Sequence, residues 1–300
     1  MIAFLYAGQG SQKVGMGQDL YNQFPLFKEY FDILTPEEKE IAFNGPLETL
    51  SDTEYTQPIM VAFAMGVTAL LKEKGIVPSM VAGLSLGEYS ALYAAGVFSK
   101  ETAVELVRFR AKAMKAACVG KQTKMVAVLQ LDRNTLAECV SEASSEGIVE
   151  IANFNCPGQI VIAGEENAVD KASELALAKG AKRCVPLNVS GPFHTSFMKP
   201  AGDALKEKFE TTSFSPMQIP VLFNCLGKEK ADQTIPELLE KQVQSSVYFE
   251  DTIQQMIDSG VDTIIEIGPG KTLSGFVKKV NKTIKLIQVE DLASLQNIGE

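Results

Sequence analysis

The sequence predicts an α/β protein in which a large subdomain with a parallel sheet is interrupted by a small inserted subdomain. Short apolar segments at residues 2–6, 80–82 and 263–267 each run into a glycine turn, as the strands of a parallel sheet do. The turn at residues 83–87 has the spacing G-x-S-x-G between a predicted strand and a predicted helix. Residues 122–190 alternate in the order β-α-β-β-α-β, which is the ferredoxin-like arrangement.

The predicted elements alternate along the chain as an α/β fold requires. Outside the insert we expect strands at 2–6, 80–82, 219–224 and 263–267, short surface helices within 20–34 and 46–52, and helices at 59–74, 101–117, 196–211, 234–244, 250–259 and 273–280. Within the insert we expect strands at 124–131, 149–153, 159–163 and 182–187 and helices at 132–145 and 165–179. Residues 1–121 and 191–300 would then form the large subdomain, and residues 122–190 the small one.

Composition describes an ordinary globular protein and argues against several classes of function. The 300 residues are 46% apolar, and the net charge of −9 argues against nucleic acid as a partner. The longest apolar stretch, residues 59–71, is too short to span a bilayer, and no targeting signal is expected at the N-terminus. Five scattered cysteines and one histidine argue against a disulfide framework and a zinc site. We expect a cytoplasmic protein with no metal and no cofactor.

Ser85 is the candidate nucleophile, because it is the central residue of Gly83-Leu84-Ser85-Leu86-Gly87. A serine hydroxyl needs a base, and His194 is the only histidine of the chain. A lone histidine often has only a structural role. Here it follows a Gly-Pro turn at the expected subdomain junction, and the order of serine before histidine is that of the α/β-hydrolases. The large subdomain is therefore expected to be α/β-hydrolase-like, with Ser85 and His194 as its catalytic pair.

No acidic residue is an obvious third member of a triad. Asp251, Asp258, Asp262 and Glu266 all have an ordinary interpretation as surface or helix-cap charges, so a backbone carbonyl is an alternative partner for the histidine. An oxyanion hole is also needed, and in an elbow one donor is the backbone N–H after the nucleophile, here that of Leu86. The glycine loop at residues 8–10 suits the second donor, because its backbone can approach a ligand closely.

Arg110 is the third candidate, since its neighbours Phe109, Ala111 and Ala113 are apolar or small. A helical arginine is usually solvated, but a partly buried one needs a carboxylate partner. No acid on its own helix is placed to supply one, so a ligand carboxylate would fill the gap. Cys156 is a conceivable thiol nucleophile, although most lone cysteines are small buried hydrophobes.

Seven short motifs in order resemble the malonyl-CoA:acyl carrier protein transacylases of fatty acid synthesis, over nearly the whole chain. They are Gly8-Gln9-Gly10-Ser11-Gln12, Thr56-Gln57-Pro58, residues 83–88, Arg110-Ala111-Lys112-Ala113-Met114, residues 153–159, residues 189–194 and residues 266–270. Leu84 departs from the family pattern, which usually has histidine before the serine.

The resemblance implies a role for each motif residue. Ser85 would carry a malonyl ester, and His194 would act as general base and acid. The Gln9 and Leu86 backbone N–H groups would form the oxyanion hole, and the main-chain carbonyl of Gln242 would orient the histidine. Three further residues would contact the substrate. Arg110 would pair with the free malonyl carboxylate, and Phe193 and Asn155 would also line the substrate site.

The implied reaction is transfer of the malonyl group from malonyl-CoA to the phosphopantetheine thiol of an acyl carrier protein. Two alternatives from other classes remain: an ordinary serine hydrolase with the same elbow, and a non-catalytic module that binds a carrier protein. A lipase or esterase gains nothing from a buried cation, so Arg110 favours the transferase. We expect the chain to be a monomer.

Overall fold

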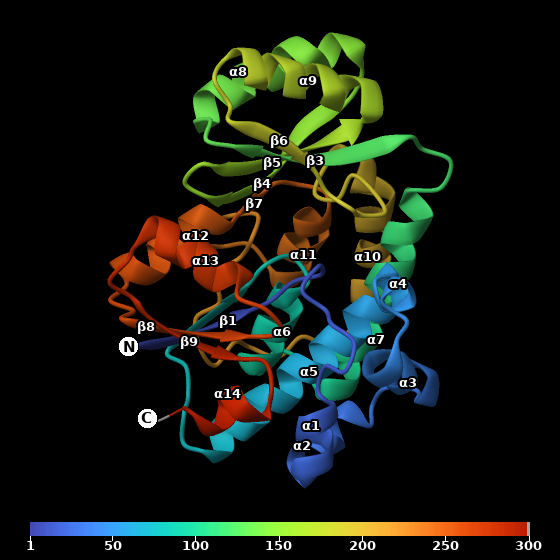
Figure 1. Ribbon diagram of the computed structural model, residues 1–300. Helices are drawn as coiled ribbons and strands as arrows, with labels where there is room; N and C mark the ends of the chain where they lie inside the picture. Colours follow the sequence, from blue (N-terminus) through green and yellow to red (C-terminus); the bar gives the residue numbers. More distant parts are fainter. Residues whose placement is uncertain (299–300) are drawn as a thin grey trace.

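The chain folds into two subdomains, each built on its own β-sheet, and the computed structural model describes residues 1–298. In Figure 1 the small subdomain lies at the top and the large one below it, and both chain ends lie on the large one. The chain passes twice between the subdomains, after residue 117 and after residue 186. The predicted division into a large unit with an insert is therefore confirmed, whereas the proposed boundary at residues 122–190 stays a prediction.

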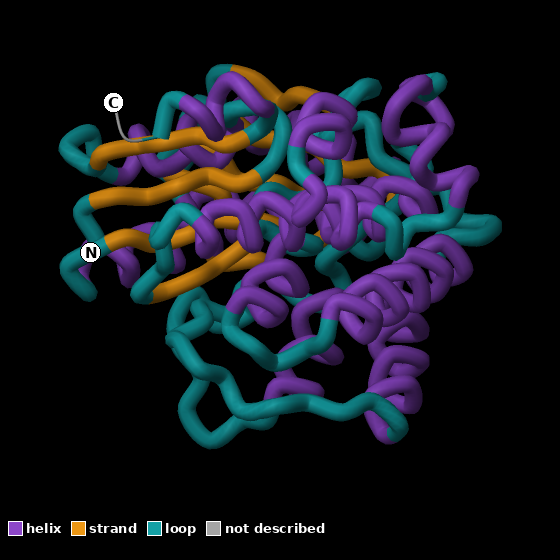
Figure 2. Tube along the Cα trace, turned by 90° about the horizontal axis from the view of Figure 1, so that it is seen from below, coloured by secondary structure: helices purple, strands orange, loops and turns teal. Residues whose placement is uncertain are grey.

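The large sheet has four parallel strands. Their order is β2 (Met80–Gly83), β1 (Ile2–Tyr6), β8 (Thr263–Ile267) and β9 (Lys285–Val289). The first three strands are almost entirely buried, as expected when helices cover both faces of a parallel sheet. Figure 2 shows strands side by side with helices packed around them. Strand β9, which the sequence did not lead us to expect, lies at one edge of the sheet, opposite β2.

The predicted strand at residues 219–224 is wrong in its extent. Only Val221 pairs with the sheet, through a single parallel bridge to Val81. Pro220 accepts a hydrogen bond from the Val81 N–H but has no N–H of its own to continue the ladder. The chain then turns at Asn224, which places this residue next to the carboxyl end of β2.

The helices that surround the large sheet were expected from the sequence with shifted ends, except for those at residues 36–44 and 292–296, which were not expected. The helices are α1 (Gln18–Gln23), α2 (Pro25–Phe31), α3 (Pro36–Asn44), α4 (Leu47–Leu50), α5 (Thr53–Glu73), α6 (Gly87–Ala94), α7 (Lys100–Ala117), η2 (Ser196–Met198), α10 (Lys199–Glu210), α11 (Ile235–Val243), α12 (Phe249–Asp258), α13 (Thr272–Val280) and α14 (Leu292–Gln296). Helix α5 starts six residues before the predicted Ile59, because the Asp52 carboxylate caps it by accepting from the Glu54 N–H. No helix in residues 1–298 is long and apolar enough to cross a membrane.

The small subdomain has the expected ferredoxin-like order. Its strands β3 (Thr123–Leu129), β4 (Val149–Cys156), β5 (Gln159–Glu165) and β6 (Arg183–Pro186) are arranged β6-β3-β5-β4 and pair antiparallel. Helices α8 (Arg133–Ala143) and α9 (Glu166–Ala178) pack together on one face of this sheet (Figure 1). A two-residue strand from the large part, β7 (Val247–Tyr248), joins β4 in parallel. The small sheet is therefore completed by a segment that lies far beyond the insert.

Candidate active site

Ser85 lies in a sharp turn between β2 and α6, with its backbone in the left-handed region at φ 52°. A Cβ on Gly83 would lie 2.1 Å from the Gly87 carbonyl carbon, and one on Gly87 would lie 2.2 Å from the Tyr6 oxygen. Both glycines are therefore required by close backbone approach. The Leu84 N–H continues the sheet by donating to the Tyr6 oxygen at 3.0 Å. The turn thus presents the serine at the carboxyl end of a parallel sheet, where α/β proteins bind ligands.

His194 is brought to the serine from a loop 109 residues away. Its Nε2 lies 2.7 Å from Ser85 Oγ, and its Nδ1 lies 2.9 Å from the main-chain oxygen of Gln242. A carbonyl oxygen only accepts, so Nδ1 carries the proton, and Nε2 is then free to accept from the serine hydroxyl. The Gln242 side chain also donates to the Ser85 carbonyl oxygen at 2.7 Å. Gln242 therefore holds both members of the pair.

The environment of His194 favours a neutral imidazole. Its side chain is 4% exposed, and burial together with the nearby Arg110 charge lowers its pKa to about 4.

The four acids considered from the sequence all have other partners. Asp251 pairs with Arg133, Asp262 pairs with the N-terminal ammonium, Glu266 accepts from the N–H groups that begin α13, and Asp258 accepts from Gln254. The carbonyl of Gln242 takes the place that an acid would hold in a triad.

Arg110 points from α7 into the same site and is 1% exposed. It donates from Nη1 to Gln57 Oε1 at 3.0 Å, and from Nη2 to Gln242 Oε1 and Ser85 Oγ, each at 3.2 Å. The arginine ion pairs within residues 1–298 involve Arg108 and Arg133, not Arg110. The guanidinium is therefore buried beside the serine hydroxyl without an ion pair to any carboxylate in residues 1–298, and burial lowers its pKa.

Two backbone N–H groups near Ser85 are free to bind an anion. Those of Gln9 and Leu86 donate to no acceptor within residues 1–298. The Gln9 side chain is engaged separately, because its Nε2 donates to Thr53 Oγ1 at 2.8 Å. The Ser85 N–H is not free, because it donates to Asn224 Oδ1 at 2.6 Å. The oxyanion hole formed by Gln9 and Leu86 therefore stays a prediction, with both N–H groups unoccupied in residues 1–298.

Phe193, Asn155 and Cys156 are less directly placed. Phe193 is buried immediately before His194, and Asn155 lies in β4 of the small sheet. Asn155 Oδ1 is buried and has no hydrogen-bond partner within residues 1–298. Burial raises the pKa of the Cys156 thiol to about 11, so it is protonated at neutral pH and is no competitor for Ser85 as a nucleophile.

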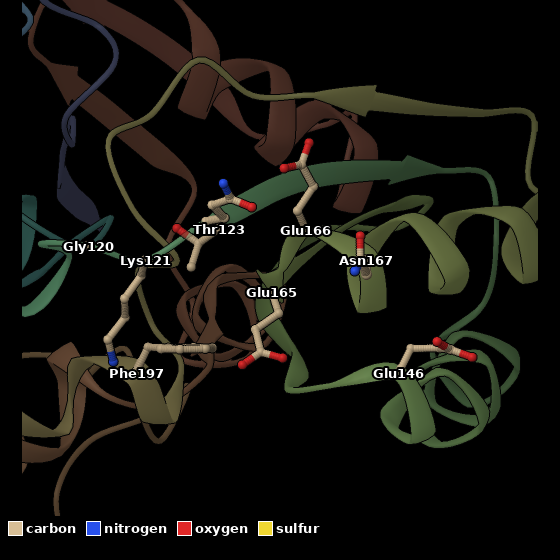
Figure 3. A pocket seen from close by; sticks show the side chains of 9 residues that line it. Gly120, Lys121, Thr123, Glu146, Glu165, Glu166, Asn167 and Phe197 are labelled. Carbon is tan, nitrogen blue, oxygen red and sulfur yellow. The ribbon is translucent and has the colours of Figure 1, made fainter.

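A separate pocket of about 410 Å³ lies where the start of β3 meets α9 and η2 (Figure 3). Lys121 Nζ lies 4.6 Å from the ring centroid of Phe197, and Figure 3 shows these two side chains together. Glu165 and Glu166 line the same pocket. It contains none of the residues predicted for the site.

The sequence did not lead us to single out the amides of Gln57 and Asn224 as parts of the site. Gln57 belongs to a recognised motif, Thr56-Gln57-Pro58, yet nothing local to that motif shows that its amide meets Arg110. Asn224 carries no motif signal, except that it ends a predicted strand. Both residues reach the site through packing of segments that are distant along the chain.

Comparison with known proteins finds relatives over nearly the whole chain. Residues 3–299 match the acyl transferase domain family. The malonyl CoA-acyl carrier protein transacylase of Bacillus subtilis is 45% identical, over 98% of this chain and 95% of the relative. The crystal structure of MCAT from Streptococcus pneumoniae superposes with a TM-score of 0.94 at 46% identity, covering 99% of this chain and 98% of that one.

A second similar structure contains a bound partner. It is a malonyl-transacylase in complex with a type II PKS acyl-carrier protein, 38% identical with a TM-score of 0.93, and the match covers 98% of this chain and 97% of that one. Identity of this level over nearly full length, with the same fold and a serine–histidine–arginine site, identifies the family. The chain belongs to the malonyl CoA-acyl carrier protein transacylases.

Proposed function

We propose that this protein transfers the malonyl group of malonyl-CoA to the phosphopantetheine thiol of an acyl carrier protein, supplying malonyl carrier protein for fatty acid synthesis. The observation that carries the proposal is the buried Arg110 guanidinium, which lies 3.2 Å from Ser85 Oγ and has no carboxylate partner within residues 1–298. A free carboxylate on the acyl group would pair with it in a water-poor site, where a charge-assisted contact is strong. A malonyl group carries such a carboxylate.

In the first half-reaction Ser85 acts as nucleophile and His194 as base. Nε2 of the neutral imidazole takes the hydroxyl proton as Oγ attacks the thioester carbonyl. The developing oxyanion is stabilised by the Gln9 and Leu86 N–H groups. When the carbon–sulfur bond breaks, the coenzyme A sulfur leaves with the proton from His194, and Ser85 holds a malonyl ester.

In the second half-reaction the carrier-protein thiol replaces coenzyme A. Nε2 of His194 takes the thiol proton as the sulfur attacks the ester carbonyl, and the proton returns to Ser85 Oγ when the ester bond breaks. The Gln242 carbonyl accepts from Nδ1 throughout, so it stabilises the imidazolium that forms in each half. The acyl carrier protein as acceptor is supported by the names of the relatives and by the solved carrier-protein complex.

A serine hydrolase has the same elbow, so the test must separate transfer from hydrolysis. Intact-mass measurement after mixing the protein with malonyl-CoA should show a stable malonyl adduct on the wild type and none on Ser85→Ala. Adding a phosphopantetheinylated carrier protein should discharge the adduct and produce malonyl carrier protein. Release of malonate without an accumulating adduct would indicate a hydrolase, and no reaction at all would indicate a non-catalytic binding module.

A further inference from the structure

Asn224 is a fully buried residue whose four backbone and side-chain polar groups are all engaged around the nucleophile. Its side-chain Oδ1 accepts from the Ser85 N–H at 2.6 Å, and its Nδ2 donates to the Gly83 oxygen at 2.7 Å. Its own N–H donates to Glu88 Oε2 at 2.5 Å, and its carbonyl accepts from the Tyr248 N–H at 2.8 Å. One amide thus spans the elbow, while its backbone is held by α6 and by β7.

The elbow needs such a support because its conformation is unfavourable by itself. A left-handed backbone at a non-glycine residue is disfavoured and persists only where surrounding contacts impose it. Asn224 holds the peptide N–H of Ser85 and the carbonyl two residues earlier, and the Gln242 side chain holds the carbonyl of Ser85. The backbone on both sides of the serine is therefore fixed by side-chain amides.

The hydrogen bonds of Asn224 affect two groups at the elbow, the Ser85 N–H and the Ser85 hydroxyl. Asn224 accepts from the Ser85 N–H, whereas the Leu86 N–H donates to no acceptor in the described part of the chain. Because the Ser85 backbone is fixed, Oγ stays 2.7 Å from His194 Nε2. A shift of about 1 Å at a reacting atom costs about a hundredfold in rate. The geometry of attack thus depends on a residue that touches neither the substrate nor the base.

We propose that Asn224 is a positioning residue. It holds the strained Ser85 backbone so that the hydroxyl stays hydrogen-bonded to His194 and directed at the substrate carbonyl. This inference rests on the proposed function, since its effect is read as the rate at which Ser85 is acylated. The Asn224 backbone is hydrogen-bonded to Glu88 on the helix after the elbow and to Tyr248 on the small sheet. The position of the nucleophile is therefore fixed relative to both subdomains.

The first test compares Asn224→Leu with the wild type in single-turnover acylation by malonyl-CoA. The rate constant per active site should fall about 10- to 100-fold. The concentration giving half the maximal rate should change less than about twofold, because Arg110 is untouched. Ser173→Ala is the matched control, since it removes a hydrogen bond from Ser173 Oγ to the Val169 oxygen within α9 of the small subdomain and should leave the acylation rate constant unchanged.

Asn224→Asp provides a second test, in which a residue that only fills space would show no pH dependence of the acylation rate constant. A protonated carboxyl accepts from the Ser85 N–H and donates to the Gly83 oxygen, as the amide does, whereas the ionised form loses the donor. The acylation rate constant of this variant should therefore rise as pH falls from about 7 to 5. The groups facing this position are Glu88, with a pKa raised to about 8, His194, with a pKa lowered to about 4, Arg110, and Cys225, with a pKa raised to about 12. The wild-type rate should stay level over this pH range.

The outcomes separate this inference from the proposed function. If the wild type forms no malonyl adduct, the proposed function fails. If the wild type is acylated and Asn224→Leu is acylated at the same rate per active site, only the positioning role is overturned. If the Leu variant does not fold, the pH profile of Asn224→Asp decides, and a level profile would overturn the role.

Discussion

At the residue scale the site depends on where charge is placed. Arg110 is a buried cation without an anionic partner in residues 1–298, and His194 is a buried imidazole kept neutral by its surroundings. An unpaired buried charge is costly, so it is retained where a ligand completes the pair. The same positive charge helps to hold the neighbouring imidazole unprotonated. In the proposed mechanism one arginine would thus select the acyl group and also keep the imidazole unprotonated.

Arg110→Ala should lower kcat/KM for malonyl-CoA by at least about a hundredfold, or ~3 kcal/mol, because the malonyl carboxylate loses its partner. Acetyl transfer should fall less or rise, since an acetyl group has no carboxylate to pair. Carrier-protein loading followed by mass spectrometry measures both. Arg108→Ala is the control on the same helix, because Arg108 pairs with Glu38 and should affect stability rather than acyl preference. Equal losses for malonyl and acetyl groups would contradict the carboxylate contact.

The acylation rate should stay level from about pH 8 down to about pH 5 and fall as the pH approaches about 4. Below its lowered pKa the imidazole is protonated and no longer accepts the serine proton. Stopped-flow release of coenzyme A over this range measures the profile, with circular dichroism as a check that the protein stays folded. An inflection near the ordinary histidine value of 6.5 would show that burial does not control the base.

At the element scale the strand–turn–helix unit of β2 and α6 determines where the nucleophile stands. Gly83 faces the backbone of Gly87, and Gly87 faces the backbone of Tyr6 at the end of the neighbouring strand. These approaches bring α6 close to the sheet and leave no room for a side chain. The elbow is therefore a packing contact between three backbone segments as well as a turn.

Gly83→Ala should destabilise the protein by more than about 2 kcal/mol and abolish acylation, because the added Cβ would overlap the Gly87 backbone at 2.1 Å. Gly275→Ala in α13 is the matched control, since a Cβ there meets nothing within 4 Å. That change should be neutral or stabilising by up to about 1 kcal/mol, owing to helix propensity. Urea denaturation monitored by circular dichroism compares the two variants, and similar midpoints would refute the steric argument.

At the scale of the whole molecule, buried polar residues connect the two subdomains through the active site. Asn224 joins the elbow to β7, and β7 completes the small sheet beside β4. On the surface of the same junction, Arg133 of α8 pairs with Asp251 of α12 at 2.7 Å. The serine, its base and the subdomain junction therefore form one connected network. Monomeric state and cytoplasmic location stay predictions.

The buried carboxyl of this network should make global stability depend on pH. Burial raises the pKa of Glu88 to about 8 from 4.5, so the folded protein binds a proton that the unfolded chain releases. Stability should then fall as pH rises toward about 8. His194 has the opposite sign, but its contribution is complete above pH 6.5, so the range above that value isolates Glu88.

Between about pH 6.5 and 8 the wild type should lose ~2 kcal/mol of unfolding free energy, whereas Glu88→Gln should stay nearly level. The glutamine keeps an oxygen to accept from the Asn224 N–H and has no proton to lose. Urea titrations at several pH values give both curves. If the unfolding free energy of the wild type and of Glu88→Gln changed equally with pH, the titrating group would not be Glu88.

The sequence by itself determined the features that are local along the chain. The G-x-S-x-G turn and the ferredoxin-like order of the insert were both predicted, because glycine spacing and hydrophobic periodicity act within a few residues. The proximity of Ser85 and His194 was expected because the chain has one histidine. Their roles were inferred from a family resemblance carried by short motifs.

Only the tertiary structure decided which distant groups complete the site. Arg110 meets Gln57 across 53 residues and Gln242 across 132, and Asn224 meets Ser85 across 139. Strands β7 and β9 exist because they complete sheets formed by distant segments. Such contacts arise from packing of whole elements, and no local pattern encodes them. The elbow was therefore predictable from its own five residues, whereas the asparagine that holds it was not.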